Sequence, residues 1–153
     1  MDLNRKRMNA GITAEDNRSE LSAGSAVTLE ITAYGSEGQG IARHNGMAVF
    51  VPGAICGETV EAEIKKAAPS FAEAKLQKIL RPSAERVIPP CPHYAECGGC
   101  DILHMSYAEQ LRMKRETVRS AMERIGGFRG IEILPCIGAD KPEHYRNLSL
   151  IHI

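Results

Sequence analysis

The most regular pattern in this sequence is an alternation of apolar and polar residues over positions 26–33. The apolar positions are Val27, Leu29, Ile31 and Ala33, with two threonines and a glutamate between them. Alternate side chains point to opposite faces of an extended chain, so this segment is predicted to be a half-buried β-strand. Shorter runs with strand character follow at positions 41–43, 47–51 and 59–64.

A fifth run occupies positions 72–80, where Ala72, Ala74, Leu76 and Lys78 alternate with Glu73, Lys75, Gln77 and Ile79. Periodicity alone also admits a helix here, but the four preceding runs favour a fifth strand. The dipeptide Asn45-Gly46 is typical of a type I′ hairpin turn. Five short strands without an intervening helix fit a small OB-like barrel better than a parallel sheet.

The pattern changes beyond the predicted barrel. Three prolines between positions 82 and 90 indicate a linker. Ser106 and Glu109 have the spacing of a capping box and Gly126-Gly127 can end a helix, so a helix is predicted over 107–125. Its apolar side would carry Tyr107, Leu111, Val118, Met122 and Ile125. Its basic side would be either a solvated surface or an RNA contact, and is formed by Arg112, Lys114, Arg115, Arg119 and Arg124.

One more strand is predicted over 131–137, as the start of a further sheet. The predicted fold is therefore mainly β. It consists of a five-stranded OB-like barrel, a small cysteine segment with one α-helix, and the beginning of that sheet. We divide the chain into a flexible tail at 1–24, the barrel at 25–83, the cysteine segment and helix at 84–130, and the start of a truncated region at 131–153.

The composition excludes some classes of protein but does not indicate a function. The chain has 153 residues, of which 43% are hydrophobic and 25% are charged. It has no apolar run of membrane-spanning length and no signal-peptide core near its start, so a cytoplasmic protein without a membrane partner is predicted. Nineteen basic and nineteen acidic side chains cancel, so net charge does not indicate a nucleic-acid partner.

Three cysteines, Cys91, Cys97 and Cys100, form a C-x5-C-x2-C motif. Thiolates are soft ligands, and three of them within ten residues suit zinc or an iron–sulfur cluster, each of which prefers four ligands. His93 or His104 could complete a zinc site, and on spacing alone zinc is slightly favoured, with free structural cysteines as the third alternative. Cys56, in a turn, and Cys136, in an apolar stretch, are weaker candidates.

These motifs together resemble the bacterial 23S rRNA (uracil-5-)-methyltransferases that carry an N-terminal TRAM domain. The TRAM-like stretch is GQGIARHNGMAVFVPG at 38–53, joined by Gly57-Glu58 and by Arg86. The cluster-like motif is Cys91-Pro92-His93 with Cys97-Gly98-Gly99-Cys100, directly behind the barrel. The resemblance extends from about residue 25 to residue 147.

The resemblance implies a [4Fe–4S] cluster with Cys91, Cys97 and Cys100 as three ligands and the fourth outside this chain. It also implies S-adenosylmethionine in the intact enzymes, where a cysteine adds to C6 of uracil and C5 takes the methyl group. Those groups belong to a domain that this sequence does not include, so the fragment is expected to be inactive and not to bind S-adenosylmethionine. Neither Cys56 nor Cys136 matches the nucleophile motif.

RNA, with 23S rRNA as the implied substrate, is the predicted partner of a monomeric chain. OB-type barrels bind single strands by stacking bases on aromatic side chains and placing cations near phosphates. The aromatic residues of the barrel are Tyr34, Phe50 and Phe71, and burial is the favoured interpretation of Phe50. The predicted RNA-contacting cations are Arg43, Lys65, Lys66 and Arg146.

Two alternatives belong to other classes. A stand-alone zinc-binding TRAM-type RNA-binding module would use the same cysteines with zinc. A radical-SAM thiotransferase also combines TRAM with iron–sulfur chemistry, but it would need a C-x3-C-x2-C motif ahead of the TRAM domain, and the order here is the reverse. The six residues after Asn147 depart from the family pattern, which indicates a truncated or artificially joined reading frame.

Overall fold

The computed structural model describes residues 21–143. Its first part is a closed barrel of five strands in the order β1-β2-β3-β5-β4. The strands are β1 (Ala26–Tyr34), β2 (Gly40–His44), β3 (Met47–Val51), β4 (Thr59–Ala67) and β5 (Phe71–Arg81). The predicted five-stranded barrel is therefore confirmed, and all five predicted strands are present, four with somewhat wider bounds and β3 with the predicted bounds.

Antiparallel pairing joins every neighbouring pair of strands except β3 and β5, which run parallel and close the barrel. The β2–β3 hairpin turns at Asn45-Gly46, where both residues have positive φ (48° and 83°), as the predicted type I′ turn requires. Gly40 lies where a Cβ atom would meet the Ala54 carbonyl oxygen at 2.9 Å, so only glycine fits there without a shift of the backbone.

The barrel interior is filled by aliphatic side chains from all five strands. Buried members of this core are Leu29, Ile31, Ala42, Val49, Val51, Val60, Ala62, Ile64, Ala72 and Ala74. They occupy alternate positions of each strand, as the period of two predicts.

Two β-bulges change which side chains reach this core. In β1 the register shifts between Ile31 and Ala33, so Ala33 is exposed rather than buried as predicted. In β5 Leu76 pairs with Ala62 and Lys78 with Glu61, so Gln77 is an extra residue in the ladder. The alternation then changes phase, and Ile79 packs against the core while Lys78 is exposed, the reverse of the prediction.

Phe50 also departs from its favoured interpretation as a core residue. Its neighbours Val49 and Val51 are fully buried in the barrel, so Phe50 lies on the outer face and is only partly covered. There it meets Phe71 of β5 edge to face, with ring centroids 6.0 Å apart and an interplanar angle of 81°.

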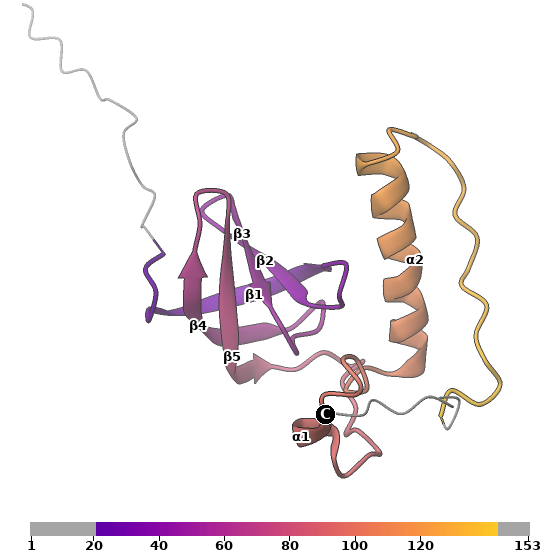
Figure 1. Ribbon diagram of the computed structural model, residues 1–153, viewed down its shortest axis with the longest axis horizontal. Helices are drawn as coiled ribbons and strands as arrows, with labels where there is room; N and C mark the ends of the chain where they lie inside the picture. The colour runs from indigo at the N-terminus through magenta and orange to yellow at the C-terminus, as the bar shows by residue number, and fades with distance from the viewer. Residues whose placement is uncertain (1–20, 144–153) are drawn as a thin grey trace, which may run out of the picture.

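Beyond the barrel lie a one-turn helix α1 (Tyr94–Cys97) and the longer helix α2 (Tyr107–Arg124). Figure 1 shows α2 standing beside the barrel and α1 in the loop region below both. The predicted helix over 107–125 is thus confirmed to within one residue. Ser106 is its N-cap and accepts from the Glu109 N–H at 3.2 Å.

The reciprocal half of the predicted capping box is not formed. The Ser106 N–H donates instead to the Glu85 carbonyl at 2.8 Å, so it has no need of the Glu109 carboxylate. The predicted apolar side of α2 also does not face the barrel. Glu109 and Met113 are the buried residues of the helix, whereas Val118 and Ile125 are exposed.

The strand predicted over 131–137 is wrong, because these residues have no regular secondary structure. They run back along α2, as Figure 1 shows, without a neighbouring strand among the described residues to supply ladder hydrogen bonds. Arg115 donates to the Ile133 carbonyl at 2.8 Å, and the Ala139 N–H donates to the Tyr107 hydroxyl at 2.7 Å.

Among residues 21–143, no helix is long and apolar enough to cross a membrane.

A buried ion pair attaches the segment after the barrel to the barrel itself. The Glu58 side chain is completely buried, and its carboxylate accepts two hydrogen bonds from Arg86, at 2.6 and 2.8 Å. Backbone N–H groups of Ile55 and Ser83 donate to the same carboxylate, and Arg86 also donates to the Gly53 carbonyl at 2.7 Å. The proline-rich segment expected to be a linker is therefore bonded to the barrel.

Replacing Arg86 with methionine should destabilise the fold strongly, because it leaves the buried Glu58 carboxylate without its cation. The expected loss is about 3–5 kcal/mol of unfolding free energy, measured by urea denaturation at neutral pH. The double variant Glu58→Gln with Arg86→Met should recover part of that loss, since no buried charge remains. Equal losses in the single and double variants would contradict this account of the pair.

Candidate functional site

The cysteine loop, residues 91–100, is the first candidate site. Cys91 begins it, Cys97 is the last residue of α1, and Cys100 follows Gly98, whose positive φ of 64° ends the short helix. The Tyr94 N–H donates to the Cys91 carbonyl at 3.2 Å, and the Cys97 N–H donates to the His93 carbonyl at 2.8 Å. All three cysteine side chains are exposed.

The donor chemistry of the loop suits a metal, but the arrangement of its donors is not that of a formed site. Three thiols within one loop are the soft ligands that zinc and iron–sulfur clusters take. Within residues 21–143, however, no three side chains of the types His, Cys, Asp and Glu are grouped so that they could hold a metal ion. The assignment of the three cysteines as metal ligands therefore stays a prediction.

Tyr94 links the cysteine loop to the residues that follow it. Its hydroxyl donates to the Asp101 carbonyl at 2.9 Å and lies 2.5 Å from Nδ1 of His104. A phenol has one hydrogen, so with that hydrogen on the Asp101 carbonyl the His104 Nδ1 must carry its own hydrogen and donate to Tyr94. His104 is then the neutral Nδ1–H tautomer.

His104 is buried, with 4% of its surface exposed, and its Nε2 atom has no hydrogen-bond partner among the described residues. The pKa of His104 is lowered to about 4, mainly by burial and also by the positive charge of Arg86, while the negative charge of Glu58 opposes both effects. Burial also raises the pKa of the Glu58 carboxyl, but hydrogen bonds from Arg86 and Ile55 outweigh it and hold that pKa below its ordinary value. At neutral pH the site holds an ion pair beside an uncharged imidazole.

A second network docks α2 on the barrel. The Tyr34 hydroxyl donates to the buried Glu109 carboxylate and accepts from the Cys56 N–H at 3.0 Å. Arg112 donates to Glu109 at 2.6 Å, and its guanidinium lies 5.9 Å from the centre of the Tyr34 ring. Burial and the Glu109 carboxylate raise the pKa of Tyr34, so it remains a protonated donor at neutral pH.

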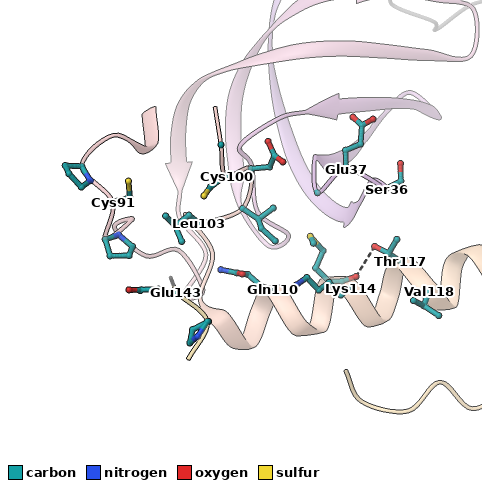
Figure 2. Close-up of a pocket in the computed structure, with 18 residues that line it drawn as sticks. Ser36, Glu37, Cys91, Cys100, Leu103, Gln110, Lys114, Thr117, Val118 and Glu143 are labelled. Atoms are coloured by element: carbon teal, nitrogen blue, oxygen red, sulfur yellow. Dashed lines mark hydrogen bonds between the residues drawn. The ribbon is translucent and has the colours of Figure 1, made fainter. Parts of the chain in front are cut away.

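An open cavity of about 1090 Å³ lies among the β1–β2 loop, the cysteine loop and α2. Figure 2 shows Cys91 and Cys100 toward one side of it, Gln110, Lys114 and Thr117 along the helix, and Ser36 and Glu37 on the barrel side. Cys97 is not among its lining residues. The cavity thus brings together two of the three predicted ligands with residues that sequence reasoning left without a role.

The predicted RNA-contacting cations are spread over the barrel. Arg43 is exposed and donates to the Gly46 carbonyl of its own hairpin at 2.9 Å. Lys65 pairs with Glu63 at 2.6 Å, and Lys66 lies 4.0 Å from Glu73. Arg146 lies outside the described residues. On α2, Arg112, Arg115 and Arg119 are bonded to Glu109, Ile133 and Glu116.

Sequence reasoning missed the two tyrosines that organise these networks. Tyr94 was unassigned between two cysteines, and Tyr34 was considered only as a barrel aromatic. The only local signal for either network was Glu109 in the capping-box position, and its carboxylate is used for tertiary docking instead. Partners 75 residues apart, as Tyr34 and Glu109 are, leave no spacing pattern to recognise.

Stability should fall as the pH is lowered from 7 to 5, because His104 stays neutral in the folded state while it protonates near pH 6.5 in the unfolded chain. Because the pKa of His104 is lower in the folded state than in the unfolded chain, the free energy of unfolding falls as the pH drops from 6.5 towards 4. At pH 5 the expected loss is about 2 kcal/mol. Urea denaturation at several pH values measures it. In His104→Asn the same pH change should cost much less, and an unchanged pH dependence there would assign the effect to other groups.

Comparisons with known proteins agree with the barrel and with the wider family. A TRAM domain model matches residues 20–77. A Clostridium tetani RNA methyltransferase is 46% identical over 123 residues, covering 80% of this chain and 26% of the relative. One from Halalkalibacterium halodurans is 40% identical over 144 residues, covering 93% of this chain and 31% of the relative. The chain thus spans less than a third of the length of these relatives.

Two solved structures are similar in sequence to parts of this chain. A conserved Methanococcus maripaludis protein has 34% identity and a TM-score of 0.35, covering 37% of this chain and 80% of that one. A Pyrococcus abyssi tRNA (uracil-54, C5)-methyltransferase bound to S-adenosyl-L-homocysteine has 26% identity and a TM-score of 0.44, covering 71% of this chain and 23% of that one. From its sequence matches, this chain carries a TRAM domain at residues 20–77 and belongs to the family of RNA methyltransferases represented by these relatives.

Proposed function

We propose that this chain is the RNA-binding and iron–sulfur part of a cytoplasmic enzyme that transfers methyl from S-adenosylmethionine to C5 of a uridine in RNA, with 23S rRNA as the substrate. The TRAM domain and the RNA methyltransferase relatives support RNA as the partner. Uracil as the target base and the cluster rest on the Cys91, Cys97, Cys100 motif placed directly behind this barrel. The catalytic groups are assigned to a part of the enzyme outside this sequence.

The observation that carries the RNA-binding role is the aromatic pair on the outer face of the barrel. Phe50 and Phe71 lie on β3 and β5, where each is partly exposed. Register places Arg43 opposite Ala48 and Ala48 opposite Phe71, so the cation and the ring lie in one row across three strands. Partly exposed rings with a cation on the same face suit the binding of a single-stranded base and its phosphate.

The negative charge of Glu73, next to the aromatic pair, does not strongly oppose RNA binding at this face. Glu73 pairs with Phe50 in the next row and carries a negative charge toward the same face. Lys66 is its cross-strand partner and lies 4.0 Å from it, which offsets that charge. Arg43 and Lys66 therefore flank the aromatic pair, whereas Lys65 pairs with Glu63 on β4.

RNA binding should weaken about tenfold when Phe50 is replaced with alanine, because one base loses its stacking partner. The measurement is filter binding of a single-stranded RNA oligonucleotide at low salt. Phe128→Ala is the matched control, since Phe128 is 54% exposed beyond the end of α2. Arg43→Glu should also weaken binding and reduce its salt dependence. If wild-type protein retains no RNA, or if Phe128→Ala and Phe50→Ala act alike, this face is not the RNA site.

The metal assignment is tested by anaerobic reconstitution followed by iron, sulfide and zinc analysis. Iron with sulfide and a broad visible absorption band is expected, and Cys97→Ser should lower both contents while Cys136→Ser leaves them unchanged. Zinc at about one ion per chain without sulfide would favour the stand-alone zinc module, whose ligand set would be the same cysteines. Absence of all three elements would contradict a metal role for the loop.

A further inference from the structure

We propose that Tyr94 and His104 form a clamp that holds the cysteine loop in one conformation, which makes them positioning residues for the three thiols. The ordering of the loop is a property of this chain alone. Its consequence for metal binding rests on the proposed function. The clamp consists of the hydrogen bond between the Tyr94 hydroxyl and His104 Nδ1, at 2.5 Å.

The first step of the argument is where Tyr94 lies. It is the first residue of α1, between Cys91 and Cys97, and its hydroxyl reaches past the third cysteine to the Asp101 carbonyl at 2.9 Å. One side chain therefore ties the middle of the loop to its end. Closing a short loop in this way reduces the number of conformations that the loop can adopt.

The second step is what holds His104. Its ring is buried, its carbonyl accepts from the Val87 N–H at 3.0 Å, and the next residue, Met105, forms an isolated β-bridge with Arg86. Arg86 in turn is bonded to the buried Glu58 of the barrel at 2.6 Å. The clamp thus connects the exposed loop to the buried ion pair at the barrel.

The third step is that the loop has little burial of its own. All three cysteines are exposed, and α1 is a single turn whose N-cap residue, His93, makes no side-chain capping hydrogen bond. Short helices and exposed loops open locally at low free energy unless a tertiary contact holds them. Tyr94 supplies that contact, because its partly buried ring lies 6.0 Å from the His104 ring and its hydroxyl is hydrogen bonded to His104.

The clamp is tested first in metal-free protein, by deuterium labelling of backbone amides with peptide mass spectrometry, because the cysteine side chains are already exposed whereas the Tyr94 and Cys97 N–H groups are hydrogen bonded within the loop. Tyr94→Phe should raise the exchange rates of the peptides that contain Cys91, Cys97 and Cys100 about threefold or more, and leave the peptide that contains Cys136 unchanged. Tyr107→Phe is the matched control, because its hydroxyl accepts from the Ala139 N–H, outside the cysteine loop, and it should leave the loop rates as in the wild type.

A conservative rescue separates positioning from general damage. His104→Asn keeps an N–H close to the position of Nδ1, so its loop rates should stay near the wild-type values. His104→Leu has no such N–H and should behave like Tyr94→Phe. Wild-type rates in Tyr94→Phe would overturn the clamp. So would an equal rise at Cys136, or equal rates in the two His104 variants, because each indicates a general loss of stability.

A second readout addresses the metal. Cobalt affinity, followed by thiolate charge-transfer absorption, should fall about tenfold in Tyr94→Phe, as expected when a group that orients ligands is lost. Wild-type affinity in that variant would overturn the positioning role toward a metal. If the wild-type chain binds neither cobalt nor iron while the labelling result holds, the proposed metal function fails and the clamp on the loop stands.

Discussion

The structure depends on one buried carboxylate. Glu58 has no exposed surface, and a charge in that position is tolerated only if its oxygens are fully hydrogen bonded. Four donors meet that need, from the Ile55 and Ser83 backbone and from both ends of the Arg86 guanidinium. Those donors come from the turn before β4, from Ser83 two residues after β5 and from Arg86 in the following segment, so one carboxylate joins three pieces of the chain.

Two networks extend from the barrel to the rest of the molecule, and they begin at different places. The Arg86 network continues through the Met105 bridge and His104 to Tyr94 in the cysteine loop. The Tyr34 network continues through Glu109 to α2. The bulge between Ile31 and Ala33 precedes Tyr34 and changes the alternation there, so that Tyr34 at the strand end is half-buried toward α2. The cavity lies between these two attachments.

A feature of this fold could be predicted from the sequence where its cause lies in neighbouring residues. The five strands, the Asn45-Gly46 turn and the bounds of α2 follow from short-range pattern and from turn or cap chemistry, and each is confirmed. The exposure of Ala33 and Lys78 could not be predicted, because a bulge depends on how two strands pair, which the alternation within one strand does not show. The strand expected over 131–137 needed a pairing partner that residues 21–143 do not provide.

The same distinction applies to the candidate site. Cysteine spacing identifies soft donors, but three nearby thiols in sequence need not be three converging thiols in space, and here the described loop does not gather them. What decides their arrangement is the conformation of the loop, which depends on a tyrosine and a histidine that ligand-spacing rules treat only as spacers or spare ligands. His104 illustrates this: its Nδ1 hydrogen is committed to Tyr94, so the sequence-based choice of His104 as a zinc ligand would leave only the buried Nε2 atom available. His104, four residues after Cys100, is thus better explained as a residue that supports the loop than as a fourth ligand to a metal.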